Sequence, residues 1–231
     1  GGGKTYFLLT LIEALLHTDA ILYILDPKNA DLADLGTVMP NVYHTKEEMI
    51  DCVNSFYEGM VQRSEEIKRH PNYKTGENYA YLGLPPCFLI FDEYVAFFEM
   101  LGVKESTSLL SQLKKIVMLG RQAGYFLIVA CQRPDAKYFS DGIRDNFNFR
   151  VGLGRISELG YGMLFGSDVK KQFFQKRIKG RGYCDVGTSV ISEFYTPLVP
   201  KGHDFLQTIG SLAQARQDGT ATCEAKGDGT D

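Results

Sequence analysis

The sequence predicts an α/β fold in which a mostly parallel sheet is flanked by helices, with a β-hairpin near the carboxyl end. Short, continuously apolar runs without alternation are typical of strands that are covered on both faces of a parallel sheet. Amphipathic segments of helical period separate these runs along the chain. A glycine-rich turn, residues 1–5, comes directly before the first helical segment, so we expect a helix that begins at a ligand-binding turn.

The turn reads Gly1-Gly2-Gly3-Lys4-Thr5, the second half of a phosphate-binding loop of the G-x-x-x-x-G-K-[ST] type. We expect its first glycine, and the strand that leads into it, before residue 1. Backbone N–H groups of such a loop surround a phosphate chain, and the helix that follows directs its positive end at the anion. On its own, this turn is equally typical of a flexible glycine-rich start. The predicted nucleotide-binding residues are Gly1, Gly2, Gly3, Lys4, Thr5 and Tyr6, with the Thr5 hydroxyl as a Mg²⁺ ligand.

Two later apolar runs end in residues that suit nucleotide hydrolysis. Cys87–Phe91 is followed by Asp92 and Glu93. In an enzyme with a phosphate-binding loop, we expect Asp92 to hold Mg²⁺ and Glu93 to polarise the water that attacks the γ-phosphate. Residues 125–131 precede Gln132, whose side-chain amide would orient the same water. Loop, acidic strand and amide in this order favour a nucleotide site over a chance match.

The remaining elements follow from local patterns. The apolar run 20–25 ends in Asp26-Pro27-Lys28, which by itself is typical of a plain turn with an exposed charge pair. Thr45 and Glu48 form a capping box that opens a long helix, and Pro71 follows its end. Further helices are predicted at 6–16, 109–119 and 158–164, a strand at 149–153, and a hairpin over 180–184 and 189–195.

Composition narrows the possible classes of protein. The net charge is −3, so binding of nucleic acid would require a local basic stripe or an assembled ring. The five cysteines are widely spaced without a C-x-x-C pair, which indicates reduced thiols rather than a disulfide or zinc framework. No apolar run approaches the roughly 20 residues that cross a bilayer, and no signal peptide is visible. We therefore expect a cytoplasmic location.

Together, these motifs resemble the motor domain of the FtsK/SpoIIIE family, and most of all the TcpA-like coupling ATPases of conjugative elements. The resemblance spans about residues 1–195. It implies a RecA-like P-loop NTPase fold with its first strand truncated, ATP and Mg²⁺ as cofactors, and a hexameric ring that pumps double-stranded or transfer-strand DNA. The motifs that carry it are Gly3-Lys4-Thr5, Asp26-Pro27-Lys28, Asp92-Glu93, Gly120-Arg121-Gln122-Ala123-Gly124, Gln132-Arg133-Pro134 and Gly180-Arg181-Gly182.

The resemblance also assigns roles to residues. Lys4 and Thr5 correspond to Walker A, Asp92 and Glu93 to Walker B, and Gln132 to the sensor. Pore loops would fall near residues 102–106 and 136–144. The resemblance names Arg121, Arg150 and Arg155 as alternatives for an arginine finger that reaches a neighbour's nucleotide, and Lys104, Lys137 and Arg144 as DNA contacts.

The expected organisation is a RecA-like ATPase motor domain over 1–199 and a polar, flexible tail over 200–231. The family's lower ring domain, membrane anchor and winged-helix module have no counterpart here, so we expect a piece of a longer protein, held at the inner face of the membrane by an anchor outside this chain. A relaxase or another conjugation protein is the expected partner. Three alternatives stay open: an FtsK-like ATPase that moves polypeptide, as in type VII secretion, a non-hydrolysing assembly module, and a small-molecule kinase.

Overall fold

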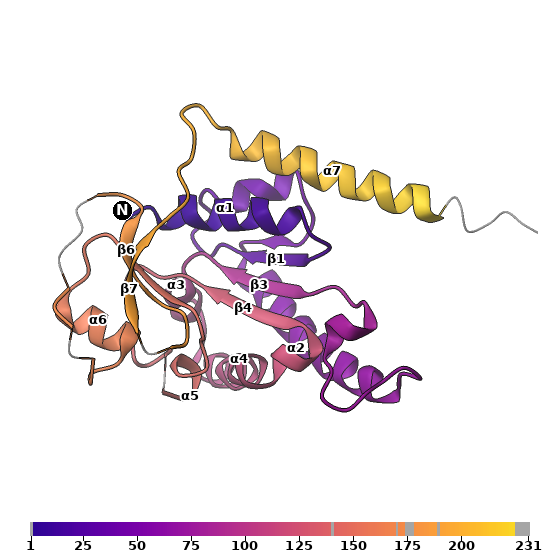
Figure 1. Cartoon of the computed structure of the whole chain (residues 1–231), viewed down its shortest axis with the longest axis horizontal. Coiled ribbons are helices and arrows are strands. Elements are labelled where there is room, and N and C mark those ends of the chain that lie inside the picture. Colours follow the sequence, from indigo (N-terminus) through magenta and orange to yellow (C-terminus); the bar gives the residue numbers. More distant parts are fainter. Residues whose placement is uncertain (1, 140, 170, 174–177, 189, 225–231) are drawn as a thin grey trace, which may run out of the picture.

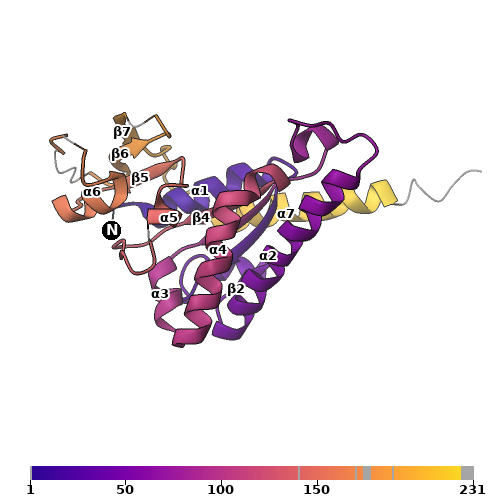
Figure 2. The same ribbon diagram turned by 90° about the horizontal axis from the view of Figure 1, so that it is seen from below.

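The computed structural model describes residues 2–139, 141–169, 171–173, 178–188 and 190–224. Its centre is a parallel sheet in the order β2-β1-β3-β4, with helices on both faces (Figures 1 and 2). The predicted α/β architecture with a parallel sheet is confirmed. The strands are β1 (Ile21–Leu25), β2 (Val42–Tyr43), β3 (Cys87–Phe91) and β4 (Tyr125–Val129).

Successive residues of β3 serve two separate cores. Leu89 and Phe91 pack with α2 (Lys46–Arg69), α3 (Tyr94–Glu99) and α4 (Val103–Ala123). Ile90 points to the other face, which α1 (Lys4–Leu16), the short helix η1 (Ala33–Thr37) and α7 (Phe205–Glu224) cover. Because both faces are covered, the strand has no polar alternation, as its sequence predicted.

The long helices begin and end as their caps dictate. Thr45 and Glu48 make the predicted capping box of α2, and the helix ends at Arg69, before Pro71. Helix α4 starts earlier than predicted, because Glu105 Oε2 accepts a hydrogen bond of 2.7 Å from the Gly102 N–H and so caps an exposed first turn. The expected pore loop at 102–106 is therefore the cap and first turn of α4. The connector between α2 and β3 contains the short helix η2 (Tyr79–Leu82).

A second, antiparallel sheet contains β5 (Arg150–Leu153), β6 (Arg181–Asp185) and β7 (Ile191–Tyr195), with α5 (Asp141–Arg144) and α6 (Glu158–Phe165) nearby. The predicted hairpin is confirmed by the β6–β7 pairing. The strand predicted at 149–153 joins this hairpin rather than the parallel sheet. Glycine is required at Gly182, since a Cβ there would lie 1.8 Å from the carbonyl oxygen of Gly152.

The expectation of a flexible tail is wrong for residues 205–224, which form α7 along α1 (Figure 1). Ile209 is fully buried and Ala213 nearly so, four residues apart on one face. His203 Nε2 lies 2.8 Å from Glu13 Oε2 at the start of this contact. Of the described side chains of this helix, only Ile209 and Ala213 are buried, with Phe205 and Leu212 partly so, and polar residues lie between them, so the sequence pattern was weak. Residues 225–231 lie outside the described residues, and the domain division near residue 200 stays a prediction.

Strand β4 lies at one edge of the parallel sheet, and within the described residues it pairs with β3 alone. All five of its residues are partly exposed, whereas four of five in β3 are buried. A strand before residue 1, as the phosphate-loop motif predicts, would find an open edge here; that strand stays a prediction. Among the described helices, none combines the length and apolar character that a bilayer crossing requires.

Candidate nucleotide-binding site

The glycine turn at the start of α1 requires residues without a Cβ. Gly3 is the N-cap, with φ +95°. A Cβ on Gly2 would lie 2.6 Å from the carbonyl oxygen of Leu153, and Gly2 itself accepts a hydrogen bond of 2.9 Å from the Gly180 N–H. No side chain among the described residues caps α1. The start of this helix therefore presents backbone N–H groups, which suits a bound anion.

Lys4 and the acidic pair after β3 converge, although about 90 residues separate them in the sequence. The Lys4 ammonium donates a hydrogen bond of 2.6 Å to the carbonyl oxygen of Asp92. Its Nζ also lies 3.4 Å from Asp92 Oδ1 and 3.2 Å from Glu93 Oε2. The carboxyl end of β3 and the first turn of α1 thus meet at one place, as the two motifs predicted.

Asp92 has the surroundings of a cation ligand. It is 6% exposed, and burial raises the pKa of its carboxyl group, an effect that the nearby Lys4 opposes. Oδ1 is buried and has no hydrogen-bond partner among the described residues. The Lys4 ammonium, 3.4 Å away, offsets its charge without a hydrogen bond, so this oxygen can still accept a donor or bind a metal ion. Asp92 is therefore suited to Mg²⁺.

The other predicted Mg²⁺ ligand, Thr5, lies in the first turn of α1. The described residues hold no cluster of three or more His, Cys, Asp or Glu that would bind a metal by itself. Mg²⁺ commonly takes one or two carboxylates and completes its shell with substrate phosphates and water. Asp92 fits that pattern, and Thr5 as the second protein ligand stays a prediction.

Glu93 is held on both carboxylate oxygens. Oε2 lies 3.2 Å from Lys4 Nζ and 3.3 Å from Lys28 Nζ, while Oε1 accepts a hydrogen bond of 2.9 Å from the Gln132 backbone N–H. The side chain is 6% exposed. Gln132 thus meets Glu93 through its main chain, and its side-chain amide, the predicted sensor group, is exposed.

Lys28 is the residue of this site that sequence reasoning missed, although it lies in a motif that was noted. The plain-turn interpretation of that motif is wrong, since Asp26 is fully buried. The Asp26 carboxylate accepts backbone hydrogen bonds from Lys28 (3.1 Å), Ala30 (2.8 Å) and Ala33 (3.0 Å). The signal was available in principle: β1 and β3 are parallel neighbours with Leu25 opposite Phe91, so their next residues share one sheet edge.

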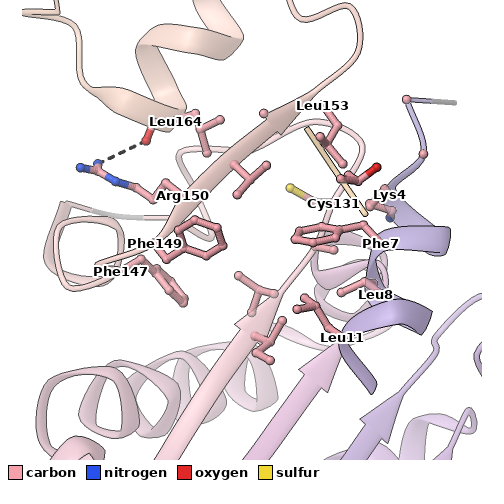
Figure 3. Close-up of a pocket in the computed structure, with 18 of the residues that line it drawn as sticks. Lys4, Phe7, Leu8, Leu11, Cys131, Phe147, Phe149, Arg150, Leu153 and Leu164 are labelled. Atoms are coloured by element: carbon pink, nitrogen blue, oxygen red, sulfur yellow. Dashed lines mark hydrogen bonds between the residues drawn. The ribbon is translucent and has the colours of Figure 1, made fainter. Parts of the chain in front are cut away.

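The predicted arginines fall in different environments. Arg150 Nη2 lies 2.7 Å from Asp185 Oδ2, and Nη1 donates to the carbonyl oxygen of Leu164 (Figure 3). Its guanidinium is thus engaged within the chain, which makes Arg150 the least suitable of the three for a neighbour's nucleotide. Arg121, in the last turn of α4, and Arg155, after β5, are exposed.

The predicted DNA contacts lie in different local environments. Lys104 is exposed in the first turn of α4. Lys137 Nζ lies 5.0 Å from the ring centre of Tyr138, and Arg144 Nε lies 3.1 Å from Asp145 Oδ1. Arg144 lines the same hollow as Lys4, whereas Lys104 and Lys137 do not. Their role with DNA stays a prediction.

A hollow of about 2040 Å³ opens beside the glycine turn (Figure 3). Gly2, Gly3, Lys4, Thr5 and Tyr6 line one part of it, together with Gln132; Gly1 lies outside the described residues. The wall nearest the sheet is apolar and comes from α1 and β4. Ligand pockets are commonly about 300–1,000 Å³, so this space exceeds what one nucleotide would fill. Lys4 and Gln132 mark the polar part where phosphates would bind.

A glycine turn at a helix start, whose lysine meets carboxylates at the end of a parallel strand, defines a P-loop nucleotide-binding domain. Comparison with known proteins agrees. The chain is 54% identical over 232 residues to the FtsK domain-containing protein YdcQ of Bacillus subtilis (strain 168), and this match covers all of the chain and 48% of YdcQ. It is 26% identical over 217 residues to the ESX secretion system protein YukB of the same organism, covering 84% of the chain and 14% of YukB. No family model matches the chain.

Solved structures share the fold at lower identity. The pCW3 conjugation coupling protein TcpA superposes with a TM-score of 0.74 at 18% identity, over 94% of this chain and 62% of TcpA. The type VII secretion ATPase EccC of Thermomonospora curvata superposes with a TM-score of 0.65 at 19% identity, over 92% of this chain and 26% of EccC. The chain is an FtsK-type domain, as its motifs predicted. It spans about half the length of YdcQ.

Proposed function

We propose that this chain is the motor part of an ATPase that couples ATP hydrolysis to DNA movement in a conjugative element. The observation that carries the proposal is the convergence of Lys4 with Asp92 and Glu93 beside a glycine turn. A lysine that now sits between two carboxylates is placed to exchange them for phosphate oxygens. The carboxylates then become free for the metal and the water, which is the division of work that phosphoryl transfer needs.

Each residue has a separate task in this proposal. The N–H groups at the start of α1 and the Lys4 ammonium bind the phosphate chain. Thr5 and Asp92 would hold Mg²⁺, which when bound would neutralise phosphate charge. Glu93, fixed through Oε1 by the Gln132 N–H, accepts a proton from the attacking water, which the Gln132 amide orients. Arg121 or Arg155 is exposed and available to a neighbouring subunit's nucleotide in a hexameric ring; Arg150 ranks below them because Asp185 holds it.

DNA is the proposed cargo because the fold matches TcpA, a conjugation coupling protein, over 94% of this chain with a TM-score of 0.74. Lys104, Lys137 and Arg144 would contact DNA phosphates without reading bases. A relaxase or another conjugation protein would be the partner, and the motor would work at the inner face of the membrane. A polypeptide cargo is the second candidate, since YukB is a protein of the ESX secretion system and EccC a type VII secretion ATPase.

The test measures ATP turnover with and without double-stranded DNA at several stated salt concentrations. We expect DNA to stimulate turnover, and the stimulation to weaken as salt rises, because phosphate contacts release counterions. Turnover that ignores DNA but responds to secretion substrates would contradict the DNA proposal and favour the polypeptide mover. Absence of any turnover by the whole protein would favour the non-hydrolysing assembly module.

Replacing Glu93 by Gln provides the matched variant. The substitution keeps the shape of the side chain and removes the carboxylate that accepts the proton. ATP binding should therefore persist, and turnover should fall by about 10²-fold or more. Turnover that survives in Glu93→Gln would remove Glu93 from its proposed role.

A further inference from the structure

We propose that Lys28 is a positioning residue for Glu93, which keeps this carboxylate oriented toward the attacking water after Lys4 has moved to the phosphates. The inference rests on the proposed function, because it concerns the same hydrolytic step. Lys28 acts only through Glu93, without touching nucleotide.

The contacts of Glu93 provide the first argument. Its Oε2 is shared by two ammonium groups, with Lys4 Nζ at 3.2 Å and Lys28 Nζ at 3.3 Å. Its Oε1 has the Gln132 N–H at 2.9 Å. Only 6% of the side chain is exposed, so bulk water compensates little for a partner that leaves. A buried carboxylate that loses its cation is strongly destabilised, so the identity of the cation that remains matters.

The two lysines differ in what surrounds them. Lys4 lies in the first turn of α1 and lines the hollow beside the glycine turn, so a triphosphate there would compete with Glu93 for its ammonium. Lys28 follows β1 and, like Asp92 and Glu93, does not line that hollow. It reaches Glu93 from the end of β1, the strand that neighbours β3. Once Lys4 binds phosphate, Lys28 is the cation left on Oε2.

The turn that carries Lys28 is fixed from inside. Asp26 is fully buried, and its carboxylate accepts three backbone hydrogen bonds, among them the one from the Lys28 N–H at 3.1 Å. Asn29 completes the turn with φ +49°. Because the backbone is held in this way, only rotation of the Lys28 side chain can move its ammonium. That side chain is 43% exposed. A surface lysine without such an anchor would contribute little.

The experiment separates turnover from binding. In the full-length protein, Lys28→Met should lower the rate of single-turnover ATP hydrolysis by about tenfold, which is less than a general base contributes. Its affinity for nucleotide should stay within about twofold of the wild-type value. Lys28→Arg, which keeps the charge, should recover most of the loss. In the Glu93→Gln background, Lys28→Met should add no further loss, because the group it positions is gone.

Lys46→Met is the matched control. It removes an ammonium that pairs with Glu105 Oε2 at 2.9 Å instead of with Glu93, and it should leave turnover unchanged. Unchanged turnover in Lys28→Met, an equal loss in the Glu93→Gln background, or a parallel loss of nucleotide affinity would each overturn the positioning role.

Failure of the proposed function gives a different result. If the wild-type protein does not hydrolyse ATP, the proposed function fails, and thermal unfolding of Lys28→Met, Glu93→Gln and the double variant still reports whether the two side chains are coupled. If the stability change of the double variant differs from the sum of the two single changes, the side chains of Lys28 and Glu93 interact. Additive effects overturn the positioning role.

Discussion

Each of the two sheets buries a carboxylate against basic side chains. The two clusters differ in how fully the carboxylate oxygens are hydrogen-bonded within the chain. In the antiparallel sheet, Asp185 Oδ2 meets the Arg150 guanidinium at 2.7 Å, and Oδ1 accepts from the Gly187 N–H at 2.9 Å. Both oxygens are thus satisfied within the chain, although Arg150 Nε is itself buried without a hydrogen bond among the described residues. At the end of the parallel sheet, Asp92 keeps a buried oxygen with no hydrogen bond among the described residues. The Lys4 ammonium is shared between two carboxylates there, at 3.4 Å from Asp92 Oδ1 and 3.2 Å from Glu93 Oε2.

The difference lies in the basic residue as well as in the oxygens. A guanidinium matches a carboxylate with directed donors and gives up that geometry reluctantly. An ammonium is a compact charge on a flexible stem, which can leave one anion for another. The closed cluster, Arg150 with Asp185, therefore serves stability. The open cluster, Lys4 with Asp92 and Glu93, serves exchange with a ligand.

The largest effect is expected at the closed cluster. Asp185→Ala leaves Arg150 partly buried without its partner, and removing one member of a buried pair costs about 3–5 kcal/mol; Arg150 is 18% exposed, so we expect about 3 kcal/mol. Urea unfolding measures this loss, while nucleotide affinity of the folded fraction should not change. The exposed Asp51→Ala serves as the control. A stability loss no greater than that of Asp51→Ala would show that the pair of Arg150 and Asp185 does not stabilise the fold.

An intermediate effect is expected at Lys4. Lys4→Met removes the charged donor of the phosphate site, so ATP affinity should fall by about 10- to 100-fold, the equivalent of about 1.5–3 kcal/mol for a charge-assisted hydrogen bond. Isothermal titration measures the affinity, with the exposed Lys68→Met as control. Stability should fall less than in Asp185→Ala, because Lys28 and the Gln132 N–H remain on Glu93. If Lys4→Met lowered the free energy of unfolding by more than the free energy of ATP binding, Lys4 would serve stability more than ligand binding.

The smallest effect is expected at Asp92, and its sign is opposite. Burial raises the pKa of this carboxyl above its ordinary value of 3.8, so folding disfavours the ionised form. The cost is present above the raised pKa and disappears as the pH falls through it. Asp92→Asn should therefore raise the Mg²⁺-free thermal midpoint at neutral pH by about 2–4 °C, and this gain should vanish in acid.

Thermal scans across pH, without nucleotide or Mg²⁺, measure this difference. A midpoint of Asp92→Asn that lies below the wild-type value at neutral pH would indicate that Asp92 is already satisfied in the unliganded chain. The same variant should lose the stabilisation that Mg²⁺ and nucleotide together give the wild type.

Local sequence patterns predicted most elements of the parallel sheet. The capping box of α2 and the apolar strands were found because each signal lies within a few consecutive residues. The start of α4 and the whole of α7 were missed for the opposite reason. The first turn of α4 is exposed and polar, and α7 buries a narrow stripe whose partner is α1, nearly 200 residues earlier.

The sequence by itself determined the parts of the site: a glycine turn that tolerates φ +95° at Gly3, a lysine after it, and two acids at the end of an apolar strand. Only the tertiary structure decided their partners. The parallel register of β1 with β3 brings Lys28 to Glu93, and the pairing of β5 with β6 engages Arg150 with Asp185. The reason is that backbone preferences are local, whereas the distance between two charged groups depends on how separate elements pack.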